Sequence, residues 1–141
     1  MLRSFFRATA FASIVCLTLA GCGNSGVVSV SGTLTYKGKP VTNAFINFVP
    51  ESGRPSMGET DENGRFTLIY DPQTKGAQIG KHRVFVQHNT VADAGKHGSV
   101  PGMAPKPSQD MTEFFNKYGG EKSKVEVTID KAVSDLKLTW D

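Results

Sequence analysis

Cysteine and histidine are the residue types in this chain with the widest chemistry, and Cys22 has the most informative surroundings. Arg3 and Arg7 precede an apolar run, Ala8–Ala20, and small residues stand immediately before the cysteine. A positive start, a short apolar stretch and small residues at the cleavage point are typical of a secretory signal. The apolar run has 13 residues, fewer than the roughly 20 that a membrane-spanning helix needs. We therefore expect residues 1–21 to be an export signal.

The segment Leu19–Cys22, with the sequence Leu-Ala-Gly-Cys, resembles the lipobox of bacterial lipoproteins. The resemblance implies cleavage between Gly21 and Cys22, a thioether bond from Cys22 to diacylglycerol, and acylation of the new amino terminus by a fatty acid such as palmitate. Two or more acyl chains hold a protein stably at a membrane. The alternative is an ordinary signal peptide with a cysteine nearby by chance. Gly23 stands where some enteric-type lipoproteins carry an inner-membrane retention Asp, so the outer membrane is favoured over the inner membrane.

Histidines are the candidates for metal binding. His82 and His88 are six residues apart on one expected strand, which places them on one face but about 20 Å apart, too far to share an ion. His88 could instead meet His97 and Asp93 if the intervening loop folds back, with Met103 and Met111 as soft ligands for copper. No tight spacing such as His-x-His occurs. We therefore favour the alternative that these residues share no target, and we expect no cofactor.

The sequence contains none of the familiar catalytic motifs. No Gly-x-Ser-x-Gly, His-Glu-x-x-His or phosphate-cradling glycine loop occurs. Cys16 lies inside the expected signal, so the mature domain has no free thiol for catalysis and no disulfide. Asp61–Gly64 contains fragments of a calcium loop, but Pro72 stands where the loop needs a glutamate, and a plain turn is favoured. We expect a protein that is not an enzyme.

Phe114, Phe115 and Tyr118 form a third group of candidates, near the end of a long irregular segment. Exposed apolar rings could dock a partner protein or a carbohydrate. The alternative, which we favour, is that Phe114 or Phe115 pins this segment to an open edge or face of the domain.

Composition limits the remaining possibilities. Removing residues 1–21 leaves 120 residues, and the loss of two arginines lowers the formal charge from +3 to +1. This length suits one domain, and no basic stripe remains to suggest a nucleic acid partner. We expect a monomer.

The mature chain alternates between apolar and polar residues, the pattern of strands with one buried face. Strands are expected at 28–36, 44–49, 65–68, 81–88, 124–129 and 136–140. Asn63-Gly64 predicts a hairpin turn. Residues 89–117 break the rhythm and predict a long surface loop with a short helical turn around Thr112–Asn116. These features predict an all-β protein, a sandwich of about seven strands.

Four segments resemble the carboxypeptidase regulatory-like domains, which are seven-stranded transthyretin-like (prealbumin-like, Ig-like) sandwiches. They are Val30–Val41, Ala44–Pro50, Thr60–Phe66 and Gly80–Val84. The resemblance covers nearly the whole mature chain and is greatest to small one-domain lipoproteins of planctomycete-type bacteria, whose Lys-Tyr-rich turn is matched by Asn116–Gly119.

Individual residues and domain boundaries follow from these patterns. Gly32 and Gly38 are expected in turns. His82 stands where the family often has a strand-anchoring Tyr, and would have to make the equivalent hydrogen bond. We expect a signal at 1–21, a lipidated tether at 22–27 and a sandwich domain at 28–141.

The function expected from the sequence is a lipid-anchored, non-enzymatic module at the cell envelope, with a structural or protein-interaction role. The first alternative is a lipoprotein that carries a small ligand, either a metal or a carbohydrate. A hydrolase with an unrecognised site is the least favoured reading.

Overall fold

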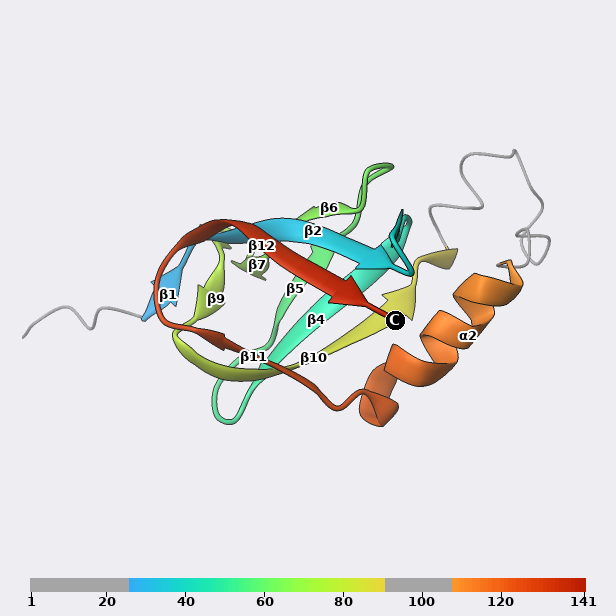
Figure 1. The fold of residues 1–141 in the computed structure, drawn as a ribbon. Coiled ribbons are helices and arrows are strands. Elements are labelled where there is room, and N and C mark those ends of the chain that lie inside the picture. The colour runs from blue at the N-terminus through green and yellow to red at the C-terminus, as the bar shows by residue number, and fades with distance from the viewer. Residues whose placement is uncertain (1–25, 91–107) are drawn as a thin grey trace, which may run out of the picture.

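The computed structural model describes residues 26–90 and 108–141, and two β-sheets packed face to face make up most of it (Figure 1). The six-strand sheet contains, in spatial order, β11 (Val125–Ile129), β10 (Gly80–His88), β4 (Ala44–Pro50), β5 (Ser56–Glu59), β7 (Ile69–Asp71) and β8 (Thr74–Lys75). The four-strand sheet contains β12 (Val133–Trp140), β2 (Val30–Tyr36), β3 (Lys39–Pro40) and β6 (Arg65–Thr67), with β3 and β6 both pairing with β2. This arrangement confirms the predicted all-β sandwich.

Several very short strands make the observed number of strands differ from the predicted seven. β1 (Val27–Val28) and β9 (Ala77–Gln78) form a separate two-stranded pair, and β3 and β8 also have only two residues each. The predicted number of seven strands is therefore not confirmed, and the transthyretin-like topology stays a prediction.

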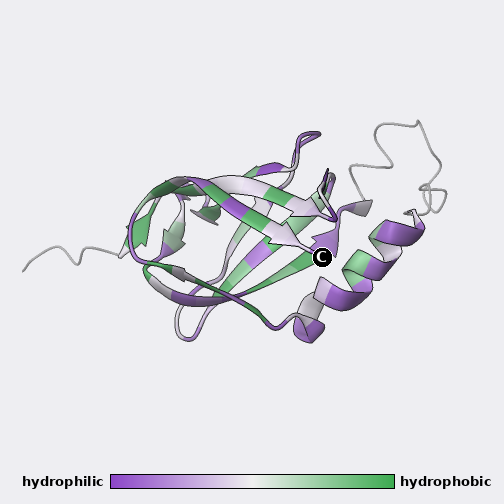
Figure 2. Ribbon diagram, viewed as in Figure 1, coloured by the Kyte–Doolittle hydropathy of each residue, from purple (hydrophilic) through white to green (hydrophobic). Residues whose placement is uncertain are grey.

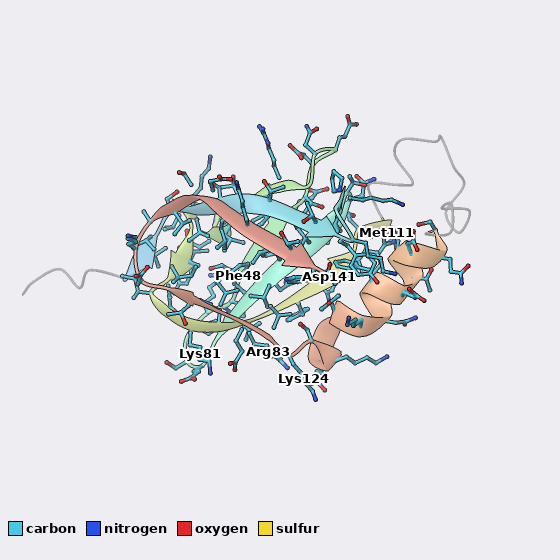
Figure 3. All side chains as sticks on the ribbon, viewed as in Figure 1. Phe48, Lys81, Arg83, Met111, Lys124 and Asp141 are labelled. Carbon is cyan, nitrogen blue, oxygen red and sulfur yellow. The ribbon has the colours of Figure 1, made fainter. Side chains whose placement is uncertain are left out.

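Alternate residues of the long strands point between the sheets and form one core. The fully buried side chains on β4 and β10 include Ala44, Ile46, Phe48, Val84 and Val86; Phe48 is labelled in Figure 3. Phe66 and Leu68 also face inward, as their alternation predicted. Hydrophobic and hydrophilic residues alternate along β12 in the same way (Figure 2).

Gly32 lies in the middle of β2, and not in a turn as expected. β12 runs parallel to β2, with a shift in register between Val133 and Leu136. A Cβ atom on Gly32 would lie only 2.1 Å from the Leu136 carbonyl oxygen. Only glycine therefore allows β12 to approach this closely. Gly38 does occupy the expected turn, with a φ of 75°.

The turn at Asp61–Gly64 is present, but it does not join two paired strands. The strand before it, β5, pairs with β4, whereas the strand after it, β6, pairs with β2. The turn thus carries the chain from one sheet to the other, which corrects the predicted hairpin. The Asp61 carboxylate accepts hydrogen bonds from the backbone N–H groups of Asn63 and Arg65, both at 2.8 Å, an arrangement that supports a plain turn over a calcium loop.

One helix, α2 (Gln109–Tyr118), closes the sandwich near the end of the expected long loop. It begins at Ser108, whose side chain accepts a hydrogen bond from the backbone N–H of Met111. The helix has 10 residues, longer than the predicted turn at Thr112–Asn116. A short 3₁₀ turn, η1 (Gly120–Lys122), connects it to β11.

The two ends of the sandwich carry different elements. β1 and β9 lie at one end, and α2 lies against the opposite end (Figure 1). Within the described ranges, no helix has the length and apolar character needed to cross a membrane.

Candidate functional site

The outward side of the six-strand sheet carries a set of apolar side chains, which we call the apolar face: Phe45, Val49, Met57, Ile69 and Phe85. Strand register places Asn47 opposite both Phe85 and Met57, and Met57 opposite Ile69. These side chains share one face because opposed residues in a sheet point the same way. Met57 is 47% exposed and Ile69 is 50% exposed. Phe45, Val49 and Phe85 are half-buried, so the exposed apolar surface of this face is concentrated at Met57 and Ile69.

A groove of about 350 Å³ crosses this face over β4, β5 and β7. Phe45, Met57, Ile69 and Tyr70 supply apolar and aromatic walls, and Pro55 and Pro72 extend them. Concave apolar surfaces with a few charged groups are the usual form of binding sites.

Charged residues line the rim of the groove: Arg54, Glu59 and Asp71. The side-chain amide of Asn89 donates a hydrogen bond to Glu59 at 2.6 Å. The backbone N–H of Gln73 donates to the Asp71 carboxylate at 2.9 Å. This bond holds the pKa of Asp71 below its ordinary value, helped by a hydrogen bond from the Thr74 side chain and by the charge of Arg54. The rim thus keeps a fixed negative charge at Asp71 beside the apolar walls.

The outward side of the four-strand sheet has a contrasting composition, and we call it the hydroxyl face: Ser31, Thr33, Thr35, Thr67 and Thr139. The Thr35 hydroxyl donates to the Thr139 hydroxyl at 3.4 Å, and the Ser31 hydroxyl donates to the Ser134 carbonyl at 3.1 Å. A shallow space of about 420 Å³ lies here, lined partly by Arg65 and Asp135. These polar groups bond to one another or face water, so the apolar groove is the stronger candidate.

Phe114 has no exposed surface, which corrects its assignment as a possible partner contact. Its ring lies 5.0 Å from that of Tyr36 and 5.7 Å from that of Trp140, measured between ring centroids. Phe115 and Tyr118 are half-buried and pack against the same core. The Tyr118 hydroxyl donates a hydrogen bond to the Asp141 carbonyl at 2.7 Å. The aromatic residues therefore pin α2 to the end of the sandwich, as the favoured alternative predicted.

Two ion pairs add to this attachment on the solvent side. Lys37 lies 3.2 Å from Glu113, and Lys39 lies 3.6 Å from Asp110. Hydrogen bonds to Tyr36 and then to Glu113 raise the pKa of Lys37. All four partners of these pairs are exposed, so we assign them a minor share of the helix attachment.

The structure separates the two described histidines. His82 is fully buried, and its Nε2–H donates a hydrogen bond to the Gln78 carbonyl at 2.8 Å, near the start of β10. His88 is half-buried at the other end of β10, with its ring 5.2 Å from that of Phe115. The described ranges contain no group of three or more His, Cys, Asp or Glu side chains suited to a metal. His97 and Asp93 lie outside the described residues.

Cys22 and Gly21, the proposed lipidation and cleavage positions, also lie outside the described residues. The apolar groove was not predicted from the sequence. Ser56–Glu59 has a glycine in its short strand and no β-branched residue, and Ile69 was expected beyond the end of a strand. In the structure, exposed Met57 and Glu59 alternate with buried Ser56 and Gly58, which the residue types alone do not indicate.

Comparisons of this chain with protein-family models, with curated proteins and with solved structures found no match.

Proposed function

We propose that this protein is a lipid-anchored lipoprotein of the bacterial cell envelope whose non-enzymatic sandwich binds another envelope protein through the apolar groove. The observation that carries the binding role is the exposure of Met57 and Ile69, side by side on β5 and β7. Large apolar side chains gathered on one exposed face favour a protein interface.

The composition of the groove favours a protein segment as the ligand. Its walls are aliphatic and aromatic, and its charged groups stand at the rim, as in interfaces that have an apolar centre and a polar edge. We therefore expect a partner segment with one or two apolar side chains flanked by charged residues.

The anchor rests on the sequence. Leu19–Cys22 follows a short apolar run in the order that lipoprotein signals require. The proposal includes membership of the carboxypeptidase regulatory-like domains, supported by the resemblance of four segments and by the all-β sandwich. Delivery to the outer membrane is part of the same proposal.

In-cell photocrosslinking tests the binding role. A photoreactive amino acid at Met57 or Ile69 should give a discrete adduct with one envelope protein. The same group at Thr67 or Thr139, on the exposed outer side of the four-strand sheet, should give none. Equal adducts from both faces, or none from Met57 and Ile69, would reject the groove as the docking site.

Intact mass of the protein extracted from membranes tests the anchor separately. The expected species begins at Cys22 and carries diacylglycerol and a further acyl chain. A chain with unmodified Cys22, recovered in the soluble exported fraction, would reject the lipoprotein assignment and leave the groove proposal standing.

A further inference from the structure

Ile79 stands at the end of the sandwich where the described chain begins. Its backbone N–H donates a hydrogen bond to the Gly26 carbonyl at 2.7 Å, and its side chain is 51% exposed. In the described part of the chain it is one of three large hydrophobic side chains with this degree of exposure. The other two, Met57 and Ile69, belong to the groove, whereas Ile79 lies apart from it next to the β1–β9 pair.

The surroundings of Ile79 make it project from the surface. Gly26 and Gly80 have φ angles of 57° and 135°, and a Cβ atom on either would meet nothing within 4 Å. These conformations favour glycine. Gly26, which is hydrogen-bonded to Ile79, and Gly80, which follows it in the chain, therefore add no side chain beside it. The Ile79 side chain is therefore a bulky apolar group flanked by two glycines that do not cover it.

The short stretch of chain between Gly26 and the proposed anchor at Cys22 indicates that a lipid bilayer covers this surface. Cys22 is four residues before Gly26, and four extended residues span at most about 14 Å. A lipid on Cys22 would hold Gly26 within about this distance of the bilayer surface. Ile79 would be held close to the bilayer as well, because its backbone is hydrogen-bonded to Gly26. α2 lies at the far end of the sandwich (Figure 1).

Neighbouring segments at the same end favour an apolar contact over an electrostatic one. Gly80 pairs with Ile129, so the turn that follows, with exposed Asp130 and Lys131, lies near Ile79. One acidic and one basic residue give this turn no net charge. Val27, half-buried on β1, pairs with Gln78, the residue before Ile79, and adds no charge at this end.

We infer that Ile79 inserts into the interface of the phospholipid bilayer that holds the anchor, and so fixes the orientation of the domain. The inference rests on the proposed lipid anchor at Cys22. In this orientation the β1–β9 end faces the membrane, and α2 points away from it. Exposed apolar side chains near an anchored chain end add a second attachment, and two attachments restrict rotation where one does not.

Thiol accessibility tests this inference, because lipidation would block the one native cysteine of the mature chain. The variants are Ile79→Cys and, as a matched control, Ile69→Cys, since the two positions are 51% and 50% exposed. Each lipidated variant is placed in vesicles of phosphatidylethanolamine and phosphatidylglycerol and treated with a membrane-impermeant maleimide. The reference is the mature form of the same variant, residues 22–141 with Cys22→Ser, which carries neither lipid nor the signal segment that contains Cys16.

The expected result is that Ile79→Cys reacts at least about fivefold more slowly in vesicles than in the unlipidated reference, while Ile69→Cys reacts at the same rate in both. Equal rates for Ile79→Cys, with lipid on Cys22 confirmed by mass, would overturn the inference and leave the anchor intact. An intact mass showing no lipid on Cys22 would overturn both. Equal protection at positions 79 and 69 would also overturn it, because it would indicate burial without a defined orientation.

Discussion

The two outward faces of this sandwich differ in their chemistry. The apolar face presents Met57 and Ile69 at about half their full exposure. The hydroxyl face presents serine and threonine side chains that bond to each other and to backbone carbonyls across β2 and β12. Both sheets bury the same kind of core. This difference is the basis of the proposal that the apolar face docks a partner.

Both sheets enclose one core, and helix α2 covers the end of that core with the buried ring of Phe114. Phe114→Ala should lower the free energy of unfolding by about 3–5 kcal/mol, the usual cost of removing a fully buried aromatic ring. Urea unfolding followed by tryptophan fluorescence measures this change, since Trp140 lies next to the ring. Phe115→Ala, which removes a half-buried ring, serves as the control and should cost less. Equal losses would contradict the assignment of Phe114 as the main pin.

The hydroxyl face has a packing constraint just beneath it at Gly32. Gly32→Ala should lower the free energy of unfolding by about 1–3 kcal/mol, because the new methyl group collides with the Leu136 carbonyl and forces β12 away. Thermal or urea unfolding measures the loss. Thr33→Ala, an outward change on the next residue, should cost much less. An unchanged stability for Gly32→Ala would show that β12 shifts without penalty.

The apolar face should tolerate polar substitution without loss of the fold. Met57→Ser together with Ile69→Ser should change the free energy of unfolding by no more than about 0.5 kcal/mol per site, and should abolish recovery of the partner identified by crosslinking. The matched control is Thr67→Ser with Thr139→Ser on the hydroxyl face, which should leave recovery unchanged. A large loss in the free energy of unfolding after the groove substitutions would show that these side chains stabilise the fold, and would contradict the proposed difference in role between the two faces.

The smallest expected effect concerns pH at the groove rim. The folded pKa of Asp71 lies below its unfolded value, so its stabilising contribution is present above the unfolded pKa and is lost as pH falls through the folded pKa. Asp71→Asn should therefore reduce stability slightly at neutral pH and flatten its decline below pH 3.8, the ordinary value of the group. Urea unfolding at several pH values measures this. Parallel curves of unfolding free energy against pH for the wild-type protein and Asp71→Asn would contradict this prediction.

Much of the fold could be predicted from alternation alone. Ala44, Ile46 and Phe48 on one strand are buried as their spacing predicted, and so are Phe66 and Leu68. Helix α2 was underestimated, because its sequence mixes polar residues with only three strongly apolar ones. The turn at Asp61–Gly64 was recognised by its residue types, but local chemistry could not say which sheet each flanking strand would join.

The sequence by itself determined the all-β class, the inward faces of the long strands and the residues on which the proposed anchor depends, because these follow from residue type and short-range spacing. Only the tertiary structure decided that Phe114 is buried, that Gly32 meets β12 and that Met57 and Ile69 share a groove. Each of these depends on contacts between segments distant in the chain, such as β2 with β12. Alternation fixes which side of a strand is apolar, whereas strand order and register fix what that side meets.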